Sequence, residues 1–214
     1  MTSTPVRRRR WPWIVTASVV AVLIVPVAIV IVPIFTHQNQ GLGGQDPTDG
    51  FPLEVSATGD DDRTRTLEVY SVQPGGVVDT AALSPGDRFV VSGTGYDASR
   101  GIYVAICVIP DDPAVKPGPC IGGVPDQEQT EVAEDTVQFA PSNWINDDWA
   151  WRLFGARSYD DVATGTFIAY LEVGDPSGEG FDCRVDACGI YTRNDHTALN
   201  DRVQDLYLPV AFAS

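Results

Sequence analysis

Four cysteines and two histidines are the residues of this 214-residue chain that could hold a metal, form disulfides or take part in catalysis. Cys183 and Cys188 stand five positions apart, and twelve residues separate Cys107 from Cys120. Zinc sites usually take cysteines in pairs with about two to four residues between them. The spacing therefore does not favour zinc, but the choice between a redox pair and structural disulfides depends on the compartment.

Catalytic residues are not evident. His196, in TRNDHTALNDR, is the histidine that a general base in the C-terminal part would need, but no G-x-S-x-G motif accompanies it and no nucleophile can be assigned. The run DPSGEG (175–180) imitates the start of a calcium-binding loop, but its twelfth position is Asp186 rather than glutamate. We therefore predict no catalytic residue, no metal site and no enzymatic activity.

The N-terminal segment predicts the compartment. Four arginines, Arg7 to Arg10, precede residues 11–35, which carry no charge. A run of this length covers the hydrocarbon core of a bilayer, about 30 Å thick. The basic cluster predicts a cytoplasmic tail (1–10), a single-pass transmembrane signal-anchor (11–35) in the cell membrane, and a domain outside the cell. A cleaved signal peptide is the alternative, although its apolar region is usually shorter, about 7–15 residues.

Charge is distributed unevenly along the chain. The arginine cluster holds four of the 14 basic residues, so the part beyond the apolar run holds 10 basic and all 29 acidic residues, a net charge of −19. Such a domain repels phosphates and anionic lipid headgroups. We therefore expect no direct contact with nucleic acid. An exterior location also favours disulfides over free thiols, and a short Cys183–Cys188 loop with a longer Cys107–Cys120 loop is the economical pairing.

Residues 36–66 are rich in Gly, Asp, Gln and Thr and show little apolar periodicity. This composition predicts a flexible acidic stalk, with an extra edge strand at 53–55 as the alternative. From residue 67 onward, short β-branched and aromatic runs alternate with turn residues, which predicts an all-β domain over 67–214. Seven strands are expected, as in an antiparallel sandwich, at 67–72, 88–96, 101–109, 135–140, 164–173, 188–193 and 205–212.

The segment 142–161, SNWINDDWAWRLFGARSYDD, does not fit the strand pattern and holds three of the five tryptophans. A short helix is expected from about Asp147 or Asp148 to Gly155. Tryptophan and arginine are enriched at binding hot spots, so the segment is a candidate partner surface, with closure of one end of the sandwich as the alternative. Its candidate residues are Trp144, Trp149, Trp151, Arg152 and Phe154.

Three stretches together resemble the neocarzinostatin-like family of actinobacteria: LSPGDRFVVSGTGYDASRGIYVAICVI, FDCRVDACGI and LYLPVAF. The resemblance implies an immunoglobulin-like seven-stranded sandwich with disulfides Cys107–Cys120 and Cys183–Cys188. It also implies a cleft for an enediyne-type chromophore, the cofactor that damages DNA in the best-known members.

The cleft residues depart from the family pattern. Ile109 stands where the family has an aromatic residue, and the loop before Cys183 keeps only Phe181 as an aromatic. The insertion PDDPAVKPGP also lies between Cys107 and Cys120. These differences make retention of the chromophore a secondary expectation.

Two functions are therefore expected, in this order. The first is a membrane-anchored extracytoplasmic interaction or accessory protein of an actinobacterial cell envelope or membrane complex. The alternative is a small-molecule module that binds an apolar ligand, such as a chromophore-type antibiotic, beside Cys107–Cys120. Its candidate cleft residues are Ile109, Phe139, Tyr170 and Phe181.

Overall fold

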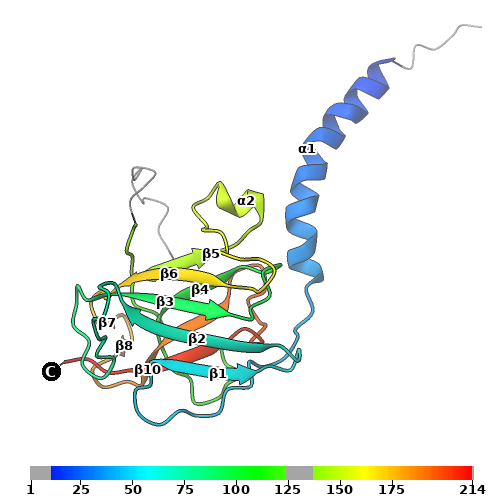
Figure 1. Cartoon of the computed structure of the whole chain (residues 1–214). Helices are drawn as coiled ribbons and strands as arrows, with labels where there is room; N and C mark the ends of the chain where they lie inside the picture. Colours follow the sequence, from blue (N-terminus) through cyan, green and yellow to red (C-terminus); the bar gives the residue numbers. More distant parts are fainter. Residues whose placement is uncertain (1–10, 124–136, 214) are drawn as a thin grey trace, which may run out of the picture. The chain divides into compact units, whose positions relative to one another are not determined.

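The computed structural model describes residues 11–123 and 137–213 (Figure 1). The chain divides into two compact units, residues 1–37 and 38–214. The first unit contains helix α1 (Trp11–Thr36), so the apolar run forms the helix expected of it. When only the described residues are considered, no helix is both long enough and apolar enough to cross a membrane. The transmembrane signal-anchor remains a prediction from the sequence.

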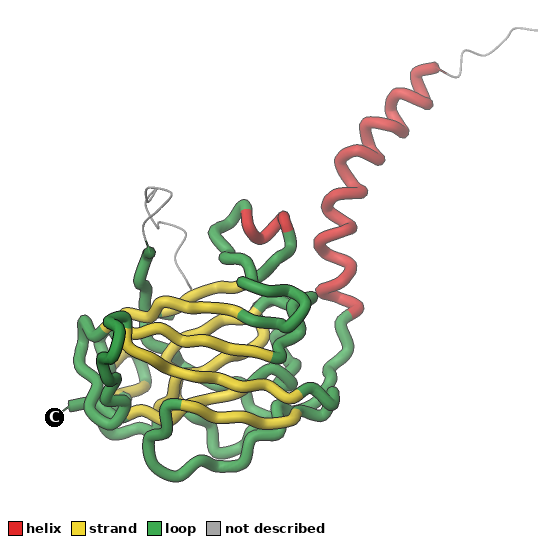
Figure 2. The backbone as a smooth tube through the Cα atoms, viewed as in Figure 1, coloured by secondary structure: helices red, strands yellow, loops and turns green. Residues whose placement is uncertain are grey.

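The second unit is a sandwich of two four-stranded antiparallel sheets, with strand orders β1-β2-β3-β6 and β10-β9-β4-β5 (Figure 1). Figure 2 shows the loops that join the strands at both ends of the sandwich. The first sheet contains β1 (Glu54–Thr58), β2 (Thr64–Ser71), β3 (Arg88–Thr94) and β6 (Phe167–Glu172). The second contains β4 (Ile102–Val108), β5 (Ser142–Ile145), β9 (Cys188–Asn194) and β10 (Leu206–Val210). A separate hairpin pairs β7 (Ser177–Gly178) with β8 (Phe181–Asp182).

The all-β prediction is confirmed, but the described residues form ten strands rather than seven. Six expected strands are present. The seventh, 135–140, begins outside the described residues, and 137–140 contain only an isolated bridge between Ala140 and Leu171. Three strands were not expected, β5, β7 and β8, whereas β1 overlaps the edge strand at 53–55 that was the alternative to a stalk. Each has five residues or fewer, which is too short for a clear alternating pattern.

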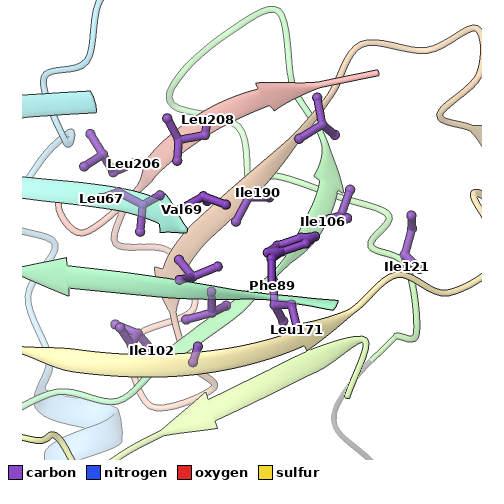
Figure 3. Packing of buried hydrophobic residues seen from close by; sticks show 14 of the residues in the cluster. Leu67, Val69, Phe89, Ile102, Ile106, Ile121, Leu171, Ile190, Leu206 and Leu208 are labelled. Carbon is purple, nitrogen blue, oxygen red and sulfur yellow. The ribbon is translucent and has the colours of Figure 1, made fainter. Parts of the chain in front are cut away.

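The alternation of side chains explains how the core forms. Buried residues recur at every second position in β2, β6 and β10, as a strand with one face toward a core requires. Figure 3 shows Leu67 and Val69 from the first sheet near Leu206 and Leu208 from the second. Burial of one such side chain contributes about 1.5–3 kcal/mol. The two inner faces therefore supply most of the hydrophobic stabilisation of the unit.

The predicted flexible stalk is wrong for residues 38–66, because these residues belong to the sandwich. β1 pairs with β2 along its whole length, and Leu42 forms a bridge with Arg202. The Gln45 side chain accepts a hydrogen bond from Tyr207 N at 2.7 Å and donates one to Tyr207 O at 2.9 Å. These bonds cover the outer edge of β10. Polar residues can cover a strand edge because the edge needs hydrogen-bond partners rather than apolar contacts. The polar composition of residues 38–66 therefore led to the wrong prediction of a stalk.

Both disulfides form as predicted. The sulfur atoms of Cys107 and Cys120 are 2.02 Å apart, and those of Cys183 and Cys188 are 2.01 Å apart. The first bond connects the end of β4 to the loop that follows it, and the second closes the turn before β9. The cysteines are therefore structural staples of the second sheet rather than metal ligands.

Candidate functional site

The aromatic segment begins as a strand and continues as a helix. β5 pairs with β4, so Trp144 lies opposite Tyr103. Helix α2 (Trp149–Arg152) follows, and its N-cap Asp148 accepts a hydrogen bond from Ala150 N at 2.9 Å. The predicted short helix is confirmed at its start, because an aspartate at the N-cap satisfies a free amide of the first turn, but it ends at Arg152 rather than at Gly155. The strand before it was not anticipated.

A packed aromatic base connects this helix to β4 and β5. We use this name for Tyr103, Trp144, Trp151 and His196. The His196 ring lies 4.6 Å from Trp151 and 5.2 Å from Trp144, both edge to face. Tyr103 Oη lies 3.0 Å from His196 Nδ1. Burial raises the pKa of Tyr103 to about 12, with Asp195 adding to the effect. The base is therefore a rigid platform, because its rings and polar atoms contact one another.

Asp195 lies beneath the aromatic base and is fully buried. One carboxylate oxygen accepts hydrogen bonds from Trp144 Nε1 and Asn146 Nδ2, each at 2.8 Å. The other accepts from Thr197 N at 2.8 Å and Thr197 Oγ1 at 2.6 Å. Four donors satisfy a buried carboxylate well. Asp195 thus connects β5 to the loop after β9 and has no spare lone pair for orienting a catalytic histidine.

An exposed apolar tip is formed by α2 and the two residues that follow it. We use this name for Trp149, Leu153 and Phe154, whose exposed fractions are 61%, 76% and 52%. Arg152 is exposed beside them. The ring centroids of Trp151 and Phe154 lie 6.3 Å apart. The predicted partner surface therefore separates into two parts, with Trp144 and Trp151 in the base and the remaining residues facing solvent.

The four predicted cleft residues lie in different packing clusters. Phe139 and Tyr170 contact each other edge to face at 5.5 Å. Ile109 packs against the buried cluster that contains Cys107, whereas Phe181 packs against the main core. The described contacts thus join only one pair of the four.

The insertion after β4 packs beside the Cys107–Cys120 disulfide. Val108 N donates a hydrogen bond to Pro119 O at 3.0 Å, and Arg193 Nη1 donates one to Pro117 O at 3.3 Å. Insertion residues therefore contact the outer side of β4 and β9, where the sequence placed a ligand.

A buried ion pair lies near this insertion. Arg202 Nη1 is 3.0 Å from Asp205 Oδ2. Burial raises the pKa of Asp205 to about 8, although the charges of Arg202 and Arg193 oppose the shift. Burial, followed by the charge of Arg193, also lowers the pKa of Lys116 on the insertion. These charges are arranged around a buried carboxylate rather than around an open ligand site.

A pocket of about 430 Å³ lies instead beside the short disulfide. Ile109 is the predicted cleft residue that lines it. Its other walls come from residues 50–51, from 183–188 and from 209–212. The positions of Phe51, Val185 and Phe212 in these walls could not be predicted from the sequence, because they come from separate segments that only the folded chain brings together.

The acidic residues of the domain do not gather around an ion in the described ranges, where no group of three or more His, Cys, Asp or Glu side chains could hold a metal. In the calcium-like run, Asp175 Oδ1 accepts hydrogen bonds from Ser177 N at 2.9 Å and Ser177 Oγ at 2.8 Å. These bonds lower the pKa of Asp175, the backbone bond most strongly. Asp175 thus stabilises a local turn.

These observations define the class of the domain, an all-β sandwich with two disulfides. Among solved structures, the chain is similar to macromomycin at 18% sequence identity and a TM-score of 0.36. The similarity covers 69% of this chain and 99% of macromomycin. Comparison with protein-family profiles and with curated proteins gives no match.

Proposed function

We propose that this chain is a membrane-anchored extracytoplasmic interaction protein that presents the exposed tip of α2 to a partner in the cell envelope or in a membrane complex. The observation that carries the proposal is the contrast between the tip and its support. Large apolar side chains project into solvent from α2 and from the two residues after it, whereas Trp151 of α2 packs against Trp144 and His196. Binding hot spots combine such anchors with rigid surroundings because little conformational entropy is then lost on association.

The location proposed for the domain is supported by two independent features. Residues 11–35 carry no charge and follow four arginines, which favours a cytoplasmic N-terminus. Two disulfides are typical of proteins outside the cytoplasm. Protease treatment of intact spheroplasts tests the orientation. We expect the domain to be degraded from outside, whereas protection of the domain in spheroplasts, but not in lysed cells, would contradict it.

The strand order supports an immunoglobulin-like assignment within the sandwich class. Strands β2, β3 and β6 are neighbours in one sheet, and β10, β9 and β4 are neighbours in the other. This arrangement corresponds to the A-B-E and G-F-C groups of an immunoglobulin-like sandwich. We accordingly propose a distant relation to the neocarzinostatin-like family, together with the loss of its cleft at the Cys107–Cys120 disulfide.

The interaction is tested by photo-crosslinking in the native membrane. A benzophenone amino acid replaces Trp149 in the full-length chain, and the control carries it at Val77, which is also exposed. We expect one discrete crosslinked species from position 149 and none from position 77. The additional change Leu153→Ser should remove that species, because it deletes a neighbouring apolar contact. Equal crosslinking from both positions would contradict a specific surface.

The small-molecule alternative lacks a common site at the place where the sequence put it. Its four candidate residues belong to different packing clusters, and the insertion contacts the surface beside Cys107–Cys120. We therefore place an enediyne-type chromophore second to a partner protein. Absence of visible or near-ultraviolet chromophore absorbance in protein purified from its own host would agree with this order.

A further inference from the structure

The pocket beside the short disulfide is assembled from three distant segments. Residues 50–51 precede β1, residues 183–188 form the disulfide turn, and residues 209–212 end β10 and continue beyond it. Its volume of about 430 Å³ lies within the range of small-molecule sites, about 300–1,000 Å³. The walls belong to the unit of residues 38–214, so the pocket does not depend on the placement of α1.

Apolar side chains dominate the rim and the walls. Val185 is 83% exposed and Phe51 is 44% exposed, and Ile109 and Phe212 are partly buried. Exposed apolar surface that becomes covered contributes about 25 cal/mol per Å². An apolar molecule that fills the pocket would therefore gain binding energy from the rim as well as from the interior.

The charged groups of the walls are already paired. Arg184 donates to both carboxylate oxygens of Asp182, from Nε at 2.8 Å and from Nη2 at 2.9 Å. Asp186 Oδ2 accepts a hydrogen bond from Asp182 N at 2.7 Å. A charged ligand would have to replace these bonds. The wall charges thus give it no advantage over a neutral one.

The backbone of the walls is also largely satisfied. Ile109 N donates to Ala187 O at 2.8 Å, and Ala211 N donates to Thr80 O at 2.9 Å. Pro209 has no amide hydrogen to offer. A ligand rich in hydrogen-bonding groups would lose water contacts without regaining them here.

We infer that this pocket binds a small, uncharged and mainly apolar molecule. The net charge of −19 on the part of the chain beyond residue 35 adds a general penalty for anions. This site goes beyond the proposed interaction through the α2 tip and is independent of it. It also differs from the predicted cleft. Its aromatic walls are Phe51 and Phe212, whereas those of the predicted cleft were Phe139, Tyr170 and Phe181.

The test uses residues 38–214, which contain the whole core and both disulfides, because detergent needed for the full chain would compete for an apolar pocket. The probe is the neutral dye N-phenyl-1-naphthylamine, whose fluorescence rises in apolar surroundings. We expect saturable binding with one dye per domain. The anionic dye 1-anilinonaphthalene-8-sulfonate should bind at least about tenfold more weakly.

Two variants fill or charge the pocket, and one matched variant leaves it intact. Ala187→Trp places a large side chain on the wall, and Val185→Asp places a charge on the rim. Each should weaken dye binding at least about tenfold, a change of about 1.4 kcal/mol. Leu153→Ser alters an exposed apolar residue directly after α2, outside the pocket, and should leave dye binding unchanged. Circular dichroism and thiol titration verify that each variant is folded and oxidised.

The inference is overturned by non-saturable fluorescence, by binding that survives both pocket variants, or by equal loss in Leu153→Ser. Tighter binding of the anionic dye would overturn the preference for uncharged ligands. Dimerisation of the domain that Ala187→Trp abolishes would assign the surface to a second copy of the chain instead. If position 149 gives no crosslink but the dye still binds, the proposed partner surface is contradicted and the pocket is not.

Discussion

The two tryptophans of α2 have the same side chain and stand two positions apart, but their surroundings differ. Trp151 contacts the rings of Trp144 and His196 at 5.9 Å and 4.6 Å. Trp149 is 61% exposed. Residues two positions apart on a helix project in directions about 200° apart, so a helix lying on a sandwich buries one and presents the other. A cluster of aromatic residues in sequence therefore combines two roles, support and contact, which must be tested separately.

The largest expected effect comes from removing the carboxylate under the aromatic base. Asp195→Ala deletes the acceptor of four hydrogen bonds in a fully buried position. We expect a loss of about 3 kcal/mol in the free energy of unfolding, because buried donors then lack partners. Urea unfolding of residues 38–214, followed by tryptophan fluorescence, measures it. The exposed Asp111→Ala is the control. A loss below about 1 kcal/mol would show that the base does not depend on Asp195.

The next effect separates the two tryptophans directly. Trp151→Ala removes a partly buried ring that contacts three aromatic neighbours. We expect a loss of about 2 kcal/mol, somewhat less than for a fully buried tryptophan. Thermal unfolding by circular dichroism should show a clear decrease of the melting temperature. If this variant is as stable as the parent protein, Trp151 belongs functionally to the tip.

A smaller effect concerns the hydrogen bond between Tyr103 and His196. Tyr103→Phe keeps the ring but deletes this bond, so about 1 kcal/mol should be lost at neutral pH.

The raised pKa of Tyr103 also predicts that the stability of the domain depends on pH. Burial raises the pKa of Tyr103 to about 12, above its ordinary value of about 10, so the folded state retains a proton that the unfolded state releases. The resulting stability is complete below pH ~10 and is lost as the pH rises through about 12. Tyr103→Phe should therefore lose less stability than the parent between pH ~9 and ~11.5. Urea unfolding at both values, with tyrosinate absorbance, checks the sign. Equal slopes would contradict a raised pKa at Tyr103.

The smallest effect on stability is expected at the tip. Trp149→Ala should change the free energy of unfolding by less than about 0.5 kcal/mol, because the side chain is mostly in contact with water. The same change should abolish partner binding if the tip is the contact surface. A stability loss comparable to that of Trp151→Ala would erase the distinction between base and tip.

The parts that could be predicted depended on local patterns. The β-branched and aromatic runs at 67–72 and 164–173 predicted β2 and β6, whose buried residues recur with a period of two because one face of each strand is buried. Asp148 marked the start of α2 through its capping chemistry. Residues 38–66 were misread as a stalk because the side chain of Gln45 covers a strand edge through polar contacts, and such contacts leave no apolar period in the sequence.

The amino-acid sequence by itself determined the secondary structure of most of the sandwich, the pairing of the four cysteines and the apolar N-terminal helix, because these follow from periodicity, spacing and charge along a short stretch of chain. Only the tertiary structure decided which aromatic residues are supports and which are exposed. It also placed Phe51, Val185 and Phe212 around one pocket. Such decisions depend on contacts between distant segments, whose geometry is set when the two sheets pack together.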